Sequence, residues 1–377
     1  MRKFIYTALV AMAAFVLIQS CKKSGDGNTG DNSSGFDRKA MLTNISANII
    51  IPAYTAFQAD AVSLDAAVTA FVASPDADKL TTVQTAFKTT YQQWQATSVF
   101  EFGPAGQVSL RVNTNTYPTD VNQINANISS NTYNPTLLAN LSAKGLPAMD
   151  YLLFGTGANN TAILAQYTTD SKAGNRKTYL AALAAELKSN ASTVLSGWGS
   201  YQNTFVNAAG TDVGSSTGQL VNQLVYDYEI LKNYEVGIPA GVQSMGNTFP
   251  TYVQAYYSKM SLQLAKLHLQ AMQNIYLGKS GQTNGLGLDD YLVQTTKLPN
   301  TAKYANGSSV NDAITTQFAT ATSKLQTLTD PLADNISSNP GAVTAAYAEL
   351  QKLTVLLKTD MTSSLSILIT YGDNDGD

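Results

Sequence analysis

Apolar residues recur at three- and four-residue steps through most of the chain after residue 37. Such spacing gathers them on one face of a helix. Pro52 and Pro331 fall inside this pattern, and we expect each to kink or break its helix. No stretch alternates apolar and polar residues with clustered β-branched side chains, so the sequence predicts an all-α fold. The longest predicted helices cover residues 37–71, 76–100, 171–205, 220–236, 251–277, 310–336 and 341–370.

One polar segment separates these helices into two groups. Residues Ala208–Gly218 are rich in Gly, Ser and Thr, a composition typical of a loop. The helices on each side carry enough apolar stripes to bury the core of a bundle. We therefore expect two helical-bundle domains, residues 37–208 and residues 219–377.

The first 36 residues have the features of an exported, anchored protein. Residues 1–20 begin with a basic Met-Arg-Lys and continue as an apolar run of signal-peptide length, too short for a comfortable membrane span. The run ends in Leu-Ile-Gln-Ser before Cys21, which resembles a bacterial lipobox. Cys21 would then be the lipidated N-terminus and residues 21–36 a flexible tether. The alternative is an ordinary secretory signal with an incidental cysteine.

The charge and cysteine content of the chain limit the classes of partner and site that the sequence predicts. Net charge is −3 and only 13% of residues are charged, so we expect no nucleic-acid partner. Cys21 is the only cysteine, which leaves the folded body without a disulfide or a cysteine metal site. The lipobox predicts membrane attachment in a bacterial cell envelope, at the outer membrane and facing the periplasm.

A compact apolar run at Lys144–Gly155 contains a single carboxylate, Asp150. Pro147 suits the first turn of a helix, and Asp150 would lie one turn later on the same face. The run resembles the imelysin signature Gly-x-His-x-x-Glu, with Gly145 at the Gly, Pro147 at the His and Asp150 at the Glu position. Three other segments are similar to the same family: Trp94 with Phe100–Pro104, Leu231–Glu235 continuing through Gly237–Gly241, and Leu357–Asp360 with the acidic end Asp373–Asp377.

The resemblance covers nearly all of the chain after the signal. It implies two helical-bundle domains with the signature near their interface. Members of the family sit in bacterial envelopes and are implicated in iron uptake, and the family is also classed as a peptidase. The candidate binding residues, taken from these motifs and from the Gly-Pro turn, are Trp94, Glu101, Arg111, Lys232 and Asp360.

The chemistry of Asp150 has three interpretations: a metal ligand, a general base, or a buried carboxylate that anchors loops. If buried it needs partners, and Glu101 and Arg111 are the expected ones. Pro147 offers no donor atom to a metal. The only histidine, His268, lies on a predicted helix and is interpreted as a hydrogen-bonded or surface residue.

A catalytic zinc site needs about three protein ligands, so zinc is not expected. Iron or calcium held by carboxylates stays open, with Asp150 as one ligand. Asp227, Glu229 and Glu235 could contribute oxygen ligands, but we expect them to be solvated on an exposed helix. The acidic end, Asp373–Asp377, imitates the start of a calcium loop and is interpreted as a solvated tail.

These features allow three functions. The first is a binding or accessory lipoprotein of iron or other nutrient uptake, with a protein partner in the uptake system. The second is a metal-dependent peptidase, which the Pro147 substitution in the signature disfavours. The third is a structural or interaction lipoprotein without a small ligand.

Overall fold

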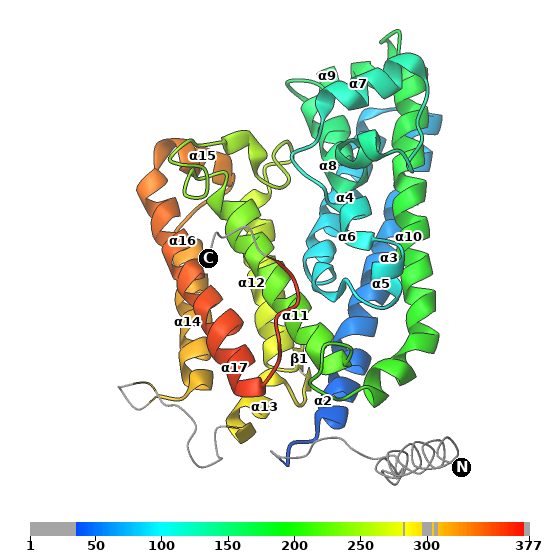
Figure 1. The fold of residues 1–377 in the computed structure, drawn as a ribbon. Helices are drawn as coiled ribbons and strands as arrows, with labels where there is room; N and C mark the ends of the chain where they lie inside the picture. The colour runs from blue at the N-terminus through cyan, green and yellow to red at the C-terminus, as the bar shows by residue number, and fades with distance from the viewer. Residues whose placement is uncertain (1–34, 282, 296–303, 305–307, 373–377) are drawn as a thin grey trace, which may run out of the picture. The chain divides into compact units, whose positions relative to one another are not determined.

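Three long helices in the first half of the chain pack side by side (Figure 1). α3 (Ile51–Ala73) lies along both α4 (Ala77–Gln95) and α10 (Ala173–Asn207). α2 (Arg38–Asn44) and the π-helical segment η1 (Ile45–Ile50) lead directly into α3. Pro52 therefore follows a widened π turn within a continuous helix, and the expected disturbance takes that form.

The second half contributes another helical group. α14 (Val310–Gln326) packs against α12 (Ser261–Tyr276) and α16 (Pro340–Val355). α11 (Ser216–Glu229) continues into the π-helical η5 (Ile230–Gly237), which contacts α16. The all-α prediction is confirmed, because the only strands among the described residues are the two-residue β1 (Lys279–Ser280) and β2 (Thr283–Asn284).

Shorter elements complete the two groups. They are η2 (Ser98–Phe100), α5 (Pro104–Gln107), α6 (Leu110–Thr114), α7 (Val121–Ser130), η3 (Leu138–Ala143), α8 (Gly145–Asp150), η4 (Tyr151–Gly155), α9 (Asn160–Thr168), η6 (Pro250–Tyr252), α13 (Leu288–Thr295), α15 (Leu332–Ser338), η7 (Leu356–Met361) and α17 (Thr362–Leu365).

The computed structural model describes residues 35–281, 283–295, 304 and 308–372. The signal peptide, the lipidation site at Cys21, most of the tether and the acidic end at Asp373–Asp377 lie outside the described residues. Predictions about them stay predictions. One described helix, Arg38–Ala73, is apolar and long enough to span a membrane, a test that core helices also pass.

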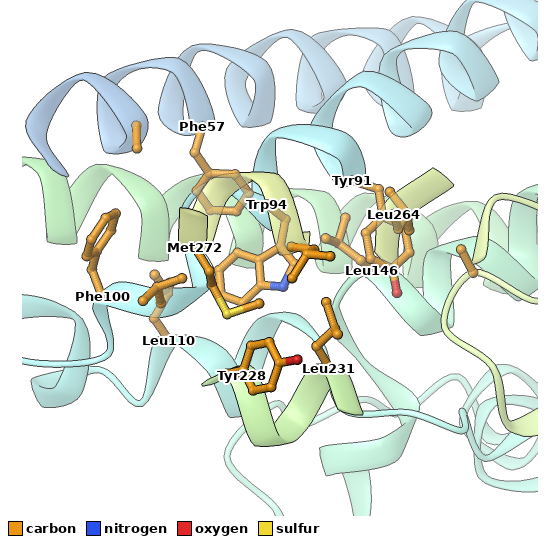
Figure 2. Packing of buried hydrophobic residues seen from close by; sticks show 14 of the residues in the cluster. Phe57, Tyr91, Trp94, Phe100, Leu110, Leu146, Tyr228, Leu231, Leu264 and Met272 are labelled. Atoms are coloured by element: carbon orange, nitrogen blue, oxygen red, sulfur yellow. The ribbon is translucent and has the colours of Figure 1, made fainter. Parts of the chain in front are cut away.

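One hydrophobic core runs through both helical groups. α4 packs on α12, and η2 packs on α11. Trp94 from the first half shares the core with Leu231 and Met272 from the second (Figure 2). Residues 34–377 form one compact unit, and a domain boundary at Ala208–Gly218 stays a prediction.

The predicted helix over residues 251–277 begins only at Ser261. Ala255 and Lys259 have positive φ angles of 52° and 60°, which a right-handed helix cannot contain. Asp330 accepts hydrogen bonds from the backbone N–H groups of Leu262 and Gln263 at 2.8 and 2.9 Å, and so caps the helix where it starts.

The two C-terminal helices are also shorter than expected. The predicted helix over residues 310–336 divides into α14, which ends at Gln326, and α15, which begins at Leu332. Pro331 is the residue immediately before α15. The last helical stretch ends at Leu365 instead of near residue 370, because Ser366 adopts a left-handed conformation.

Candidate functional site

The signature-like run folds as α8 followed by η4. Gly145 has a φ of 67°, and a Cβ there would lie 2.3 Å from the Thr114 carbonyl oxygen, so only glycine fits. Pro147 and Asp150 are both buried. Residues 144–150 of this run are all buried, whereas Tyr151, Phe154 and Gly155 are partly exposed.

Asp150 holds a loop from the second half of the chain. Its Oδ2 accepts from the Tyr257 N–H at 2.8 Å, and its Oδ1 accepts from the Ser258 N–H at 2.9 Å. Burial raises the pKa of Asp150 to about 6, against the opposing effect of these hydrogen bonds and of Lys88. The expectation that Glu101 and Arg111 would pair with Asp150 is wrong, because backbone donors satisfy the carboxylate instead.

The space next to this carboxylate is small. A cavity of about 30 Å³ lies against Pro147, Asp150, Tyr117 and Tyr257. A polar cavity of that size holds about one water molecule. Each Asp150 oxygen accepts one backbone hydrogen bond, and Asp150 is the only acidic residue that lines this cavity, so its role as a metal ligand stays a prediction.

A second polar cluster brings together three segments that are distant in the sequence: η2, the continuous helix of α11 and η5, and α12. His268 on α12 lies between two carboxylates: its Nε2 is 2.5 Å from Asp227 Oδ2, and its Nδ1 is 2.8 Å from Glu235 Oε1. Ser98 Oγ donates to Asp227 Oδ2 at 2.9 Å and lies 3.2 Å from His268 Nε2. His268, Asp227 and Glu235 are each at most 3% exposed.

Arg111 completes this cluster. Its terminal nitrogen Nη2 lies 3.1 Å from Asp227 Oδ1 and donates to the Ser98 carbonyl at 2.8 Å. Its backbone N–H donates to Glu101 Oε2 at 2.9 Å, and its guanidinium lies over the Tyr226 ring at 5.2 Å. The Arg111 guanidinium thus contacts both the Tyr226 ring and the buried Asp227 carboxylate.

The cluster sets the protonation of its members. Burial alone lowers the pKa of His268, but the carboxylates of Asp227 and Glu235 outweigh it and raise the pKa to about 10. Burial raises the pKa of Asp227, but His268 and Arg111 outweigh it and hold the pKa below its ordinary value. At neutral pH the cluster therefore contains two cations and two carboxylates.

A cavity of about 170 Å³ adjoins the cluster. Four buried atoms of its lining residues make no hydrogen bond to any described residue, and one of them, Asp227 Oδ1, is ion-paired with Arg111 Nη2. The other three have neither a hydrogen bond nor an ion pair: Arg111 Nε, Tyr117 Oη and Glu235 Oε2. Buried polar atoms are usually paired, so these three mark a place where a ligand or ordered water fits. The lining residues are Trp94, Gln95, Ser98, Arg111, Asn115, Thr116, Tyr117, Tyr226, Asp227, Ile230, Tyr234, Glu235 and His268.

A larger hollow of about 510 Å³ lies between α3, α4 and α12. Its only titratable lining residues are Asp60 and Lys279, and neither is buried. Most of its other polar groups are Gln and Asn side chains. The smaller cavity, with its concentrated charge and unpaired atoms, is the stronger candidate site.

The order Ser98, His268, Glu235 imitates the serine–histidine–carboxylate chain of hydrolases. Asp227 interrupts that chemistry, because it binds the same His268 nitrogen that faces Ser98. A histidine with a pKa near 10 keeps its proton at neutral pH and cannot act as a general base there. In the described part of the chain, no group of three or more His, Cys, Asp or Glu side chains is arranged to hold a metal ion.

The structure gathers some of the sequence candidates and separates others. Trp94 and Arg111 line the cavity, and Glu101 contacts Arg111. Lys232 is buried in η5 and Asp360 accepts from the Tyr304 hydroxyl, but neither lines the cavity.

The expected solvation of Asp227, Glu229 and Glu235 is wrong. All three are buried, and Glu229 lies 3.0 Å from Lys358. A signal for the buried cluster was present in the spacing. His268 lies four residues from Leu264 and from Met272, and therefore on the apolar face of its helix.

The fold has counterparts among solved structures. An iron-regulated protein A precursor from Parabacteroides distasonis superposes with a TM-score of 0.71 at 16% identity, covering 90% of this chain and 97% of that one. An imelysin-like protein from Psychrobacter arcticum gives 0.65 at 19% identity, with 90% and 98% coverage.

The sequence matches agree with the fold. Iron-regulated protein A of Synechococcus elongatus is 22% identical over 328 residues, which are 82% of this chain and 83% of that protein. The family model described as imelysin matches residues 50–358. The chain belongs to the imelysin family, and the resemblance inferred from its motifs is confirmed.

Proposed function

We propose that this protein is a binding or accessory component of iron uptake in a bacterial cell envelope, attached to the membrane by a lipid at Cys21. Support for the iron connection comes from the names of two relatives, both called iron-regulated protein A. Support for attachment comes from the lipobox-like run before Cys21. A protein of the uptake system is the proposed partner.

One observation favours binding over peptide hydrolysis. Carboxylates engage both ring nitrogens of His268, the only histidine of the chain, and hold it protonated. That leaves no histidine to act as the general base of a serine mechanism and no free imidazole for a metal mechanism. The cavity next to it still has unpaired donor and acceptor atoms, which suits recognition of a small molecule.

The role is tested by iron accumulation in cells. A strain lacking the gene is grown under iron limitation and given radioactive iron, with the wild-type gene, an Arg111→Met gene or an empty vector supplied in trans. The parent strain is the reference. We expect accumulation to fall without the gene and to recover with the wild-type copy only. Equal accumulation in all four strains would refute the proposed role.

The anchor is tested separately. Replacing Cys21 by Ala should release the protein from membranes or leave its signal unprocessed, while Ser24→Ala, in the predicted tether, is the control. A Cys21→Ala protein that has lost its signal and still sediments with membranes would disprove lipid attachment.

A further inference from the structure

We infer that the cavity between Arg111 and Glu235 binds a small zwitterion, a free α-amino acid. This inference rests on the proposed binding function, because it assigns a ligand class to the same cavity. Its basis is one unpaired donor atom, Arg111 Nε, and one unpaired acceptor atom, Glu235 Oε2, on two oppositely charged residues that line the same cavity.

The unpaired groups have complementary chemistry. Arg111 uses Nη2 for its side-chain contacts with Ser98, Gln223 and Asp227, and leaves Nε without a described partner. Glu235 uses Oε1 for His268 and leaves Oε2 without one. A carboxylate on the ligand would accept from the Arg111 side, and an ammonium group would donate to Glu235.

Charge balance selects a zwitterion over a singly charged ligand. The buried cluster pairs Arg111 and His268 with Asp227 and Glu235, so these four charges cancel one another. Glu101 adjoins Arg111, and burial raises the pKa of its carboxyl group. A lone cation or anion would add an uncompensated charge next to ionic groups that are themselves buried, which is costly. An amino acid brings both charges at once and leaves the balance unchanged.

The walls and size of the cavity indicate what else the ligand carries. Trp94, Tyr117, Tyr226 and Tyr234 contribute aromatic surface, and Tyr234 is 47% exposed at the protein surface. These rings would cover an apolar or aromatic side chain. The volume of about 170 Å³ is below the roughly 300–1,000 Å³ of pockets for drug-sized ligands, which excludes bulky chelates.

The Tyr117 hydroxyl is a third unpaired polar group on the residues that line the cavity. This hydroxyl is buried, has no described hydrogen-bond partner, and has a raised pKa because of burial and then the Glu235 carboxylate. Tyr117 and Glu235 both line this cavity, and Tyr117 also lines the small cavity next to Asp150. We assign the Tyr117 hydroxyl as a second acceptor for the ligand ammonium beside Glu235.

Binding is tested on the purified full-length protein. The free L-amino acids are screened one at a time by thermal shift, and the strongest is measured by titration calorimetry. It is then compared with its decarboxylated amine and its deaminated acid, which each carry one charge. We expect a Kd below about 1 mM, and at least about tenfold weaker binding of each analogue. No binding by any amino acid, or equal binding of either analogue, would overturn the inference.

Two tyrosine variants separate binding from folding. Tyr117→Phe removes a hydroxyl without a described partner, so stability should hold while affinity falls by about fivefold or more, as for a lost charge-assisted bond. Tyr276→Phe is the control, because its hydroxyl bonds Asn311 away from the cavity and its loss should leave the Kd unchanged. Unchanged affinity in Tyr117→Phe, or equal losses in both variants, would contradict the assigned position.

The outcomes distinguish this inference from the proposed function. Amino-acid binding without an effect on iron accumulation would refute the iron role and leave the ligand class standing. Reduced iron accumulation without amino-acid binding would refute the ligand class and leave the iron role standing.

Discussion

Two buried sites in this protein handle carboxylates in opposite ways. Asp150 in the signature-like run is held by two uncharged backbone N–H groups, and its pKa rises to about 6. Asp227 in the buried cluster is held by His268 and Arg111, and its pKa falls. Both are almost fully buried, so the charge of the donors makes the difference.

The two sites also differ in how many of their buried polar atoms have hydrogen-bond partners. The Asp150 contacts are complete, since both oxygens have backbone partners, and they fasten residues 257–258 in place. The buried cluster has charges of both signs and atoms left over, because Arg111 Nε and Glu235 Oε2 have no described partner. Polar groups whose hydrogen bonds are all made hold a loop in place, whereas polar groups with unpaired atoms can still bind a ligand.

Removing the shared cation should have the largest effect. His268→Leu leaves Asp227 and Glu235 buried without their common partner, and we expect a loss of about 3–5 kcal/mol in the free energy of unfolding. Urea denaturation measures it. Gln270→Leu, exposed on the same helix, is the control and should change stability by less than about 0.5 kcal/mol. A His268→Leu loss no greater than the control would contradict the ionic cluster.

Breaking the backbone cap should cost less. Asp150→Ala leaves the buried N–H groups of Tyr257 and Ser258 without their acceptors, and we expect a loss of about 2–3 kcal/mol. Asp150→Asn keeps one acceptor oxygen and should lose about half as much. Thermal unfolding compares the two. Equal losses in the two variants, which both lack the charge, would show that charge and not hydrogen bonding is what this site needs.

The pH dependence of stability should distinguish the two sites. The pKa of His268 is raised from 6.5 to about 10, so its protonated form favours the folded state. The stabilisation is complete below about pH 6.5 and is lost as pH rises towards 10, with a slope of at most about 1.4 kcal/mol per pH unit. The groups facing His268 are Asp227, Glu235, Ser98 and, across Asp227, Arg111.

Denaturant titrations at a series of pH values measure this slope as the difference in unfolding free energy between wild type and His268→Leu. The difference removes the contributions of titratable groups away from the cluster. Asp150 has a raised pKa as well, so its ionisation should weaken the fold as pH rises from about 4 to about 6. A wild-type excess of stability that grows between about pH 7 and 10 would contradict the assignment of a protonated His268.

Chelation should have the smallest effect of all. Both Asp150 oxygens are engaged by the backbone, and both His268 nitrogens by carboxylates. We therefore expect an excess of EDTA to change the melting temperature by less than about 1 °C. Stoichiometric zinc in the purified protein, with chelator-sensitive peptide cleavage that Asp150→Ala abolishes, would instead establish a metallopeptidase.

The fold was accessible from sequence because local spacing determines it. The step of three and four residues located the long helices, including α10 within two residues at each end. The segment before Ser261 was predicted incorrectly. Its apolar spacing is helical, but Asp150 binds its N–H groups at Tyr257 and Ser258, and Asp330 caps the helix that begins only at Ser261. Those carboxylates lie far away in the sequence, so no local pattern reveals them.

The site was only partly accessible for the same reason. Arg111 and Trp94 came from motifs and line the cavity, but their partners Asp227, Glu235 and His268 lie more than 100 residues further along the chain. Charged residues on helices are usually solvated, and that expectation failed for these residues. Their position on apolar helix faces was visible, but spacing alone does not show which charges would meet.

The π-helical segments affect how this chain tolerates change. A π turn encloses one more residue between bonded backbone groups than an α turn does. Asp150 immediately precedes η4, Glu235 lies in η5, and Asp360 lies in η7. Deleting a single residue from Ile230–Gly237 would let that stretch rewind as an α-helix, which changes the direction in which the side chains around the deletion point. Glu235 meets His268 at this helical phase, so a deletion here disturbs the site in a way that no single substitution can.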